Sequence, residues 1–226
     1  MSNFIRNIIK NIKRNNFAKK QRSKVLKDGT LLNSFNNKKI IFIHIPKTAG
    51  ISLVISIFGN VTLEGHRSVS FYKQVFGSRY SDFFTFTIVR NPWDRLYSAY
   101  KFLEKGGMNI HDKNAFETHL SIFRDFEDFV LNGLNKKLIY QITHLIPQHE
   151  YLCDKRGSIL VDFIGRFENL DNDIFLLSNK LRKKIKLSHH NYNKKEGYKE
   201  MYTDEMIDKV YRIYQKDIEV FEYSFE

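Results

Sequence analysis

The sequence is poor in several features that would identify broad classes of protein. Its 226 residues contain three prolines and eleven glycines, too few for a collagen-like or Pro/Gly-rich low-complexity chain. No run approaches the ~18 consecutive apolar residues of a membrane-spanning helix. The one cysteine, Cys153, excludes an internal disulfide and a cysteine-rich zinc site, and it favours a reducing compartment.

What the sequence does contain is enough apolar material for a sizeable core. Hydrophobic residues make up 42% of the chain and aromatic residues 15%, which excludes a wholly disordered protein. The length favours one domain with an appendage.

The net charge of +12 is concentrated at the N-terminus. Residues 1–39 hold eleven Lys and Arg against one acid, while the remaining 187 residues have a net charge of +2. A nearly neutral body does not indicate a groove for nucleic acid, so no nucleic-acid partner is expected. The sequence predicts a basic tail and linker over residues 1–39 and a single domain over residues 40–226.

The residue pattern of the tail predicts a basic amphipathic helix. At helical spacing its apolar residues fall on one face and its cations on the other: Phe4, Ile5, Ile8, Ile9 and Ile12 against Arg6, Lys10, Lys13 and Arg14. One interpretation is contact of residues 1–20 with an anionic membrane surface. The alternatives are a helix that docks on the chain's own domain and a frayed, solvated extension. Residues 20–39 are predicted to be a linker.

The first half of the body alternates between strand and helix patterns. Short apolar runs predict strands at 40–45, 61–64 and 83–89, and helical spacing predicts helices at 50–58, 68–76 and 92–103. This β-α-β-α-β-α order predicts a parallel sheet flanked by helices, an α/β fold.

The second half is predicted to be mainly helical. Residues 112–150 carry a core stripe of Phe123, Phe126, Phe129 and Val130. Further elements are a strand at 159–167, a helix at 170–181, a polar loop at 188–200 and a final helix capped by Thr203. Met206, Val210, Tyr214 and Phe221 of that last helix are predicted to face the core.

Three chemically notable residues follow the three predicted strands of the first half. Lys47, His66 and Arg90 each stand just past a strand end, where open parallel sheets bind ligands. Residues 46–52 form a small-residue turn opening a helix, which suits a phosphate. In this turn the lysine precedes the glycine, whereas in a Walker A loop the lysine follows it. The third predicted strand carries no clear Walker B carboxylate. A magnesium-dependent kinase therefore has little support.

Arg90 and His66 each have a functional and a structural interpretation. A guanidinium at Arg90 with the hydroxyl of Ser98 nearby suits a phosphate, and the alternative is a helix-end salt bridge from Arg90 to Asp94. His66 is suited by its ordinary pKa to remove a proton near neutral pH, and the alternative is a loop histidine without catalytic role.

Two segments closely resemble the carbohydrate sulfotransferases of the chondroitin/uronosyl type. They are Ile43-His44-Ile45-Pro46-Lys47-Thr48-Ala49-Gly50-Ile51-Ser52 and Thr87-Ile88-Val89-Arg90-Asn91-Pro92-Trp93-Asp94-Arg95-Leu96-Tyr97-Ser98-Ala99-Tyr100. Shorter matches are Gly65-His66-Arg67-Ser68, Pro147-Gln148, Gly165-Arg166-Phe167-Glu168-Asn169 and residues 217–225. That family transfers a sulfuryl group from 3′-phosphoadenosine 5′-phosphosulfate (PAPS) to a sugar hydroxyl and leaves adenosine 3′,5′-bisphosphate (PAP).

The resemblance implies a P-loop-like fold and a role for each site residue. The 5′-phosphosulfate would be bound by the first loop, namely Lys47, Thr48, Ala49, Gly50, Ile51 and Ser52. Arg90 and Ser98 would bind the 3′-phosphate. The catalytic residues would be His66 as base and Lys47 as the cation that stabilises charge on the transferred group, and no metal is required.

The sequence departs from that family in places. Ile51 stands where a threonine is usual, and Glu222 stands where glycine is frequent. Many relatives carry a lumenal domain behind a membrane anchor, whereas this sequence, with no anchor and no cysteine pair, is similar to the soluble bacterial members. We therefore expect a cytoplasmic protein, peripheral at the inner face of the membrane if the tail binds lipid.

The predicted function is sulfuryl transfer from PAPS to a carbohydrate or glycoconjugate hydroxyl by in-line displacement. Rival hypotheses are a nucleotide-binding regulatory module without transfer activity, a small-molecule kinase, and nucleic-acid binding through the tail. No spacing in residues 104–150 or 188–200, which are expected to shape the acceptor cleft, specifies a particular acceptor.

Overall fold

A computed structural model describes residues 16–17, 19–187 and 197–225 of the chain. The predicted amphipathic helix of residues 4–12 and most of the predicted loop at 188–200 lie outside these residues. Within the described part, no helix combines the length and the apolar character needed to cross a membrane.

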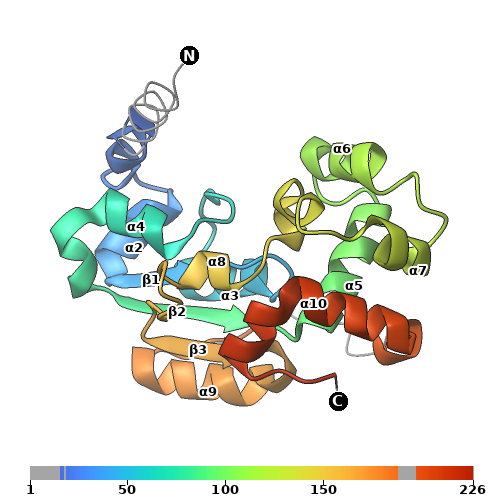
Figure 1. Cartoon of the computed structure of the whole chain (residues 1–226). Coiled ribbons are helices and arrows are strands. Elements are labelled where there is room, and N and C mark those ends of the chain that lie inside the picture. The colour runs from blue at the N-terminus through green and yellow to red at the C-terminus, as the bar shows by residue number, and fades with distance from the viewer. Residues whose placement is uncertain (1–15, 18, 188–196, 226) are drawn as a thin grey trace.

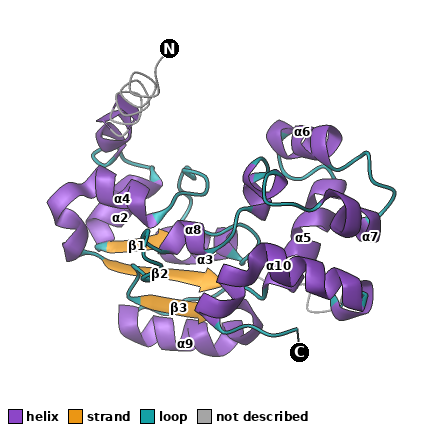
Figure 2. Cartoon of the chain, viewed as in Figure 1, coloured by secondary structure: helices purple, strands orange, loops and turns teal. Residues whose placement is uncertain are grey.

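The centre of the molecule is a parallel sheet of three strands with helices on both faces (Figures 1 and 2). The strands are β1 (Ile40–Ile43), β2 (Phe84–Val89) and β3 (Phe163–Arg166), in the spatial order β1-β2-β3. Phe42 of β1 lies opposite Phe86 of β2. The predicted mixed α/β class with a helix-flanked parallel sheet is thereby confirmed.

The helices fall into two groups along the chain. Those of the first half are α2 (Leu31–Lys38), α3 (Gly50–Phe58), α4 (Val69–Phe76), η1 (Gly77–Asp82) and α5 (Pro92–Glu104). Those of the second half are α6 (Ile110–His119), α7 (Phe126–Asp128), η2 (Phe129–Gly133), η3 (Leu138–Tyr140), η4 (Thr143–Leu145), α8 (His149–Leu152), η5 (Phe167–Asn169), α9 (Leu170–Leu181), η7 (Lys199–Met201) and α10 (Asp204–Phe221).

Two strand predictions were wrong in whole or in part. Residues 61–64 do not join the sheet, because Thr62 forms a bridge with Thr30 instead, and β1 therefore lies directly beside β2. Only Phe163–Arg166 of the predicted strand 159–167 pairs with β2, since Ile159 bridges back to Cys153. The helices predicted at 50–58 and 170–181 have the predicted bounds.

Part of the predicted linker at 20–39 is instead a helix packed into the domain. The Thr30 hydroxyl caps α2 by accepting a hydrogen bond from the backbone N–H of Asn33. Leu31, Leu32 and Phe35 of α2 are buried against the sheet. The linker was predicted from the charge and asparagine content of this segment. Three apolar side chains at helical spacing instead make it a helix that packs on the domain.

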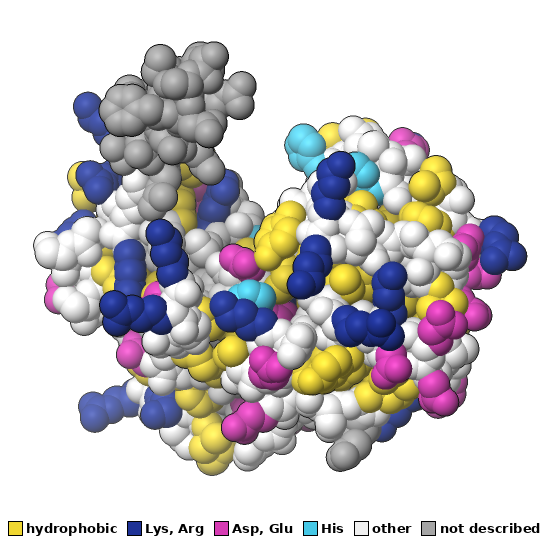
Figure 3. All heavy atoms as spheres, in the orientation of Figure 1, with side chains coloured by type: hydrophobic (Ala, Val, Ile, Leu, Met, Phe, Trp, Pro, Cys, Tyr) yellow, Lys and Arg dark blue, Asp and Glu magenta, His cyan; other side chains and the backbone are white. Residues whose placement is uncertain are grey.

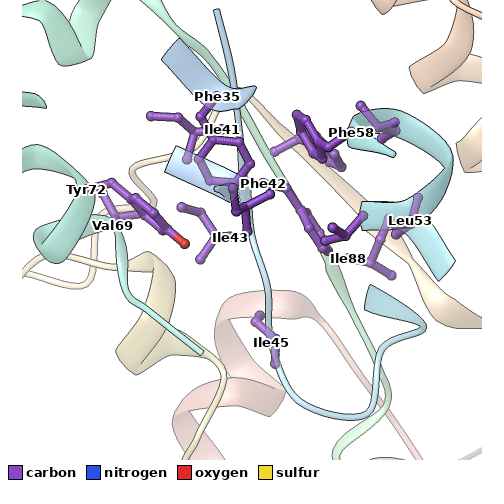
Figure 4. Packing of buried hydrophobic residues seen from close by; sticks show 14 of the residues in the cluster. Phe35, Ile41, Phe42, Ile43, Ile45, Leu53, Phe58, Val69, Tyr72 and Ile88 are labelled. Atoms are coloured by element: carbon purple, nitrogen blue, oxygen red, sulfur yellow. The ribbon is translucent and has the colours of Figure 1, made fainter. Parts of the chain in front are cut away.

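The first core surrounds β1. Figure 4 shows Ile43 beside Tyr72 and Val69 of α4 on one side, and Leu53, Phe58 and Ile88 on the other. Because both faces of β1 are covered, its sequence is a continuous apolar run with no polar alternation.

A second core lies between α5, η2 and α10. Phe126, Phe129 and Val130 are buried there as predicted, and Phe123 packs against them partly exposed. Thr203 caps α10, and the four side chains of that helix predicted to face inward are all buried: Met206, Val210, Tyr214 and Phe221. Figure 3 shows a notch in the surface between the part that carries α4 and the part that carries α6.

Candidate active site

The loop that joins β1 to α3 has an unusual backbone. Lys47 and Ala49 both have positive φ values, 70° and 61°, although neither is glycine. Such left-handed residues cost energy outside glycine, and alternating them in a turn directs backbone N–H groups toward one concave face. Ala49 is the N-cap of α3 and no side chain caps the helix, so its first N–H groups are available to an anion.

Side chains around this loop fix its shape. The Thr48 hydroxyl is fully buried and donates to the carbonyl oxygen of Ile45 (2.9 Å), so it closes the loop from within. A Cβ atom added to Gly50 would overlap the His44 ring, so only glycine fits there. Ile51 is half-buried and Ser52 is buried on the first turn of α3. The Thr48 hydroxyl therefore stabilises the loop backbone, and contact of Thr48 with an anion stays a prediction.

Arg90 follows β2, and three neighbouring residues fix its side chain in place. Its Nε and Nη2 donate to the two carboxylate oxygens of Asp94 at 2.7 Å each, so the helix-end salt bridge considered for Arg90 is present. Its Nη1 donates to the carbonyl oxygen of Lys47 (2.9 Å), and its guanidinium lies 4.0 Å from the Phe167 ring centroid. A guanidinium has five N–H donors, so two have no hydrogen-bond partner among the described residues.

The backbone of Arg90 is fixed by Gln148, which the sequence marked only as part of a family-like pair. The Gln148 side chain accepts from the Arg90 N–H (2.9 Å) and donates to the Arg90 carbonyl oxygen (2.8 Å). It thus continues the hydrogen bonding of the sheet beyond the end of β2. Ser98 is half-buried on α5 and forms no side-chain hydrogen bond with another described residue.

His66 is tied to the segment that precedes the first loop. Its Nδ1 lies 2.9 Å from the carbonyl oxygen of His44. A carbonyl oxygen can only accept, so Nδ1 carries the proton and Nε2 presents a lone pair. Burial lowers the pKa of His66, partly offset by that hydrogen bond and by Asp112, so the ring stays neutral at neutral pH.

The Lys47 side chain of the first loop contacts α5. Its Nζ sits 3.9 Å above the Phe102 ring of α5. Burial and the neighbouring Arg90 lower its pKa to about 8. It is therefore mostly charged at neutral pH and loses that charge within the mildly alkaline range.

The structure brings Lys47, His66 and Arg90 to one place, and only part of the predicted reason holds. Lys47 follows β1 and Arg90 follows β2, and these strands are adjacent and parallel, as expected. His66 follows no strand of the sheet, and its hydrogen bond to the carbonyl oxygen of His44 places it here instead. A hydrogen bond from Arg90 to the carbonyl oxygen of Lys47 joins the two strand ends.

Two site residues were missed from the sequence. His144 of η4 has its ring centroid 5.9 Å from that of His66, and its Nδ1 lies 3.7 Å from a carboxylate oxygen of Asp112. Burial lowers the pKa of His144 to about 4, so it is neutral. No sequence motif marks either residue, because Asp112 on α6 and His144 on η4 come together only in the folded chain.

Comparison with protein families gives a match to the sulfotransferase family over residues 32–224. The chain belongs to the sulfotransferase family. No curated protein and no solved structure matches it. The match covers the sheet and every residue described in this site. Membership of this family supports sulfuryl transfer as the general reaction.

Proposed function

We propose that this sulfotransferase-family chain transfers a sulfuryl group from PAPS to a hydroxyl of a carbohydrate or glycoconjugate. The observation that carries the proposal is the fixed tautomer of His66 beside two anion-binding elements. A neutral imidazole with a bare Nε2 suits proton abstraction, and binding alone does not require it.

The residues present suit the donor. The left-handed turn at Lys47 and Ala49 and the uncapped start of α3 would bind the 5′-phosphosulfate. The two remaining N–H donors of Arg90 would bind the 3′-phosphate, and Asp94 and Gln148 hold that side chain and its backbone in place. Ser98 lies half-buried on the same helix as Asp94, and its contact with the 3′-phosphate stays a prediction.

The reaction is an in-line displacement at sulfur. As the acceptor oxygen forms its bond to sulfur, His66 Nε2 takes the hydroxyl proton, and the bond from sulfur to the phosphate oxygen breaks to release PAP. Lys47 stabilises the charge that develops on the sulfuryl and leaving phosphate oxygens. His144 lies beside His66 and is paired with Asp112, so both are candidates to contact the acceptor.

The test is His66→Ala, with His119→Ala at the end of α6 as the matched control. A general base contributes about 10²–10⁴-fold to rate, so turnover should fall by that order while PAP affinity stays nearly unchanged. Labelled PAPS with a panel of glycoside acceptors measures turnover, and calorimetry measures PAP affinity.

Four results would contradict parts of this proposal. Transfer at near wild-type rate without His66 would assign the base elsewhere, with His144 the next candidate. Loss of PAP affinity together with rate would make His66 a donor-binding residue. Binding of PAP with no transfer to any acceptor would favour a nucleotide-binding regulatory module, and preference for ATP with magnesium would favour a kinase.

A further inference from the structure

The loop that presents His66 has little structure of its own. Residues 59–68 connect α3 to α4, and apart from the bridge at Thr62 they form no helix or strand. Within the loop, Arg67 Nε donates to the carbonyl oxygen of Glu64 (3.1 Å). A loop of this kind holds a reactive side chain in place only if other parts of the chain fix it.

The segment before α2 supplies such contacts on both sides of His66. Ahead of it, the Thr62 N–H donates to the carbonyl oxygen of Gly29 (2.9 Å), and the Glu64 carboxylate accepts from Lys24 Nζ (2.8 Å). After it, the guanidinium of Arg67 lies 5.3 Å from the ring centroid of Phe17.

This segment is itself anchored to the domain. Val25 is 3% exposed and belongs to the first core. Arg22 Nη2 donates to the carbonyl oxygen of Gln74 on α4 (2.7 Å), and the Thr30 hydroxyl donates to the carbonyl oxygen of Lys24 (2.7 Å). The contacts at residues 62, 64 and 67 therefore connect the His66 loop to a fixed structure.

We infer that Phe17 and residues 19–30 form a brace that positions His66 for proton transfer. The inference rests on the proposed function, in which His66 is the base. The family match begins at residue 32, so the brace lies outside the matched residues. Lys24 is its central positioning residue, because it pairs with a carboxylate two residues from His66.

The Lys24–Glu64 pair allows stability and positioning to be separated. The Glu64 side chain is only 5% exposed, so removing Lys24 alone leaves a buried carboxylate without its partner. Removing the charge on both partners relieves that penalty but does not restore the connection to residue 64. A double variant should therefore recover stability while its turnover stays low.

The first experiment compares Lys24→Met with Lys24→Arg, and uses Lys27→Met, an exposed lysine of the same segment, as the control. Misplacing a reacting group by about 1 Å can cost 10²-fold in rate, so a loosened His66 loop should lower turnover by about tenfold. Turnover should fall in Lys24→Met, return in Lys24→Arg and stay unchanged in Lys27→Met. PAP affinity should stay within about twofold in all three, since the loop at Lys47 is not touched.

The second experiment uses the double variant Lys24→Met/Glu64→Gln and ¹⁵N NMR of the His66 ring. Recovered thermal stability with low turnover, and with an Nδ1–H signal that broadens or exchanges faster, supports the brace. Full turnover and an unchanged ring signal in Lys24→Met would overturn it, as would low turnover that recovers with stability in the double variant. If the wild type transfers no sulfuryl group, the proposed function fails, while the ring signal still tests the brace.

Discussion

The two elements that we propose as anion-binding are built in opposite ways. The loop after β1 gains its shape from backbone, through left-handed Lys47 and Ala49 and an uncapped helix start, within one short stretch of sequence. Arg90 after β2 gains its geometry from side chains, with Asp94 on the next helix and Gln148 from 58 residues away.

Because of this difference, substitutions should affect the two elements in different ways. A backbone cradle keeps most of its donors when a side chain is changed, and so loses mainly the charge that the side chain supplied. A guanidinium held by other side chains loses its position when any of them is removed, because each leaves a buried group without its partner.

Replacing Lys47 should have the largest effect. We expect Lys47→Ala to lower turnover by about 10²–10³-fold, the usual result of removing one group that stabilises transition-state charge. PAP affinity should fall much less, because the backbone donors remain. Measured turnover and calorimetric PAP affinity separate the two, and an equal loss in both would mean that Lys47 acts in ground-state binding.

Arg90→Ala should act on binding instead of turnover. A hydrogen bond to a charged group is worth about 1.5–3 kcal/mol, so PAP affinity should fall about 10- to 100-fold. Affinity for adenosine 5′-phosphate, which lacks the 3′-phosphate, should barely change. Equal loss for both nucleotides would show that Arg90 does not distinguish the 3′-phosphate.

Gln148→Met and Thr48→Val compare the supports of the two elements directly. Gln148→Met leaves the N–H and carbonyl of Arg90 without partners, so unfolding free energy should fall by about 2 kcal/mol or more, with weaker PAP binding. Thr48→Val removes one hydrogen bond to Ile45, worth about 1 kcal/mol, with PAP affinity nearly kept. Urea denaturation and PAP titration measure both. A larger loss of PAP affinity in Thr48→Val would reverse the comparison.

The pH dependence should show the smallest effect within the physiological range. Burial lowers the pKa of His66 below its ordinary 6.5, so kcat/KM should fall only below that pH, as the ring gains a proton. Lys47, with a pKa lowered to about 8, should lose its charge above that pH, so kcat/KM should fall there too. Arginine stays protonated, so the alkaline fall should vanish in Lys47→Arg. Its persistence in that variant would assign it to another group.

Local patterns in the sequence predicted much of this molecule. The apolar runs of β1 and β2, the helical spacing of α3 and α9, and the Thr203 cap of α10 each gave an element close to its observed bounds. The strand predicted at residues 61–64 was wrong, because a short segment with two β-branched residues does not specify its pairing partner, and Thr62 bonds to residues 29 and 31 instead.

The conformation of the loop after β1 follows from local sequence, because it depends on a few adjacent residues and on Gly50 beneath the His44 ring. Local patterns also place Lys47, His66 and Arg90 in loops that follow apolar segments. Tertiary contacts, in contrast, bring Gln148 to the end of β2, His144 and Asp112 beside His66, and Lys24 to the His66 loop. Each of these contacts joins residues more than 30 positions apart, and such pairings leave no periodic pattern because the physics that selects them is packing and burial in the folded chain.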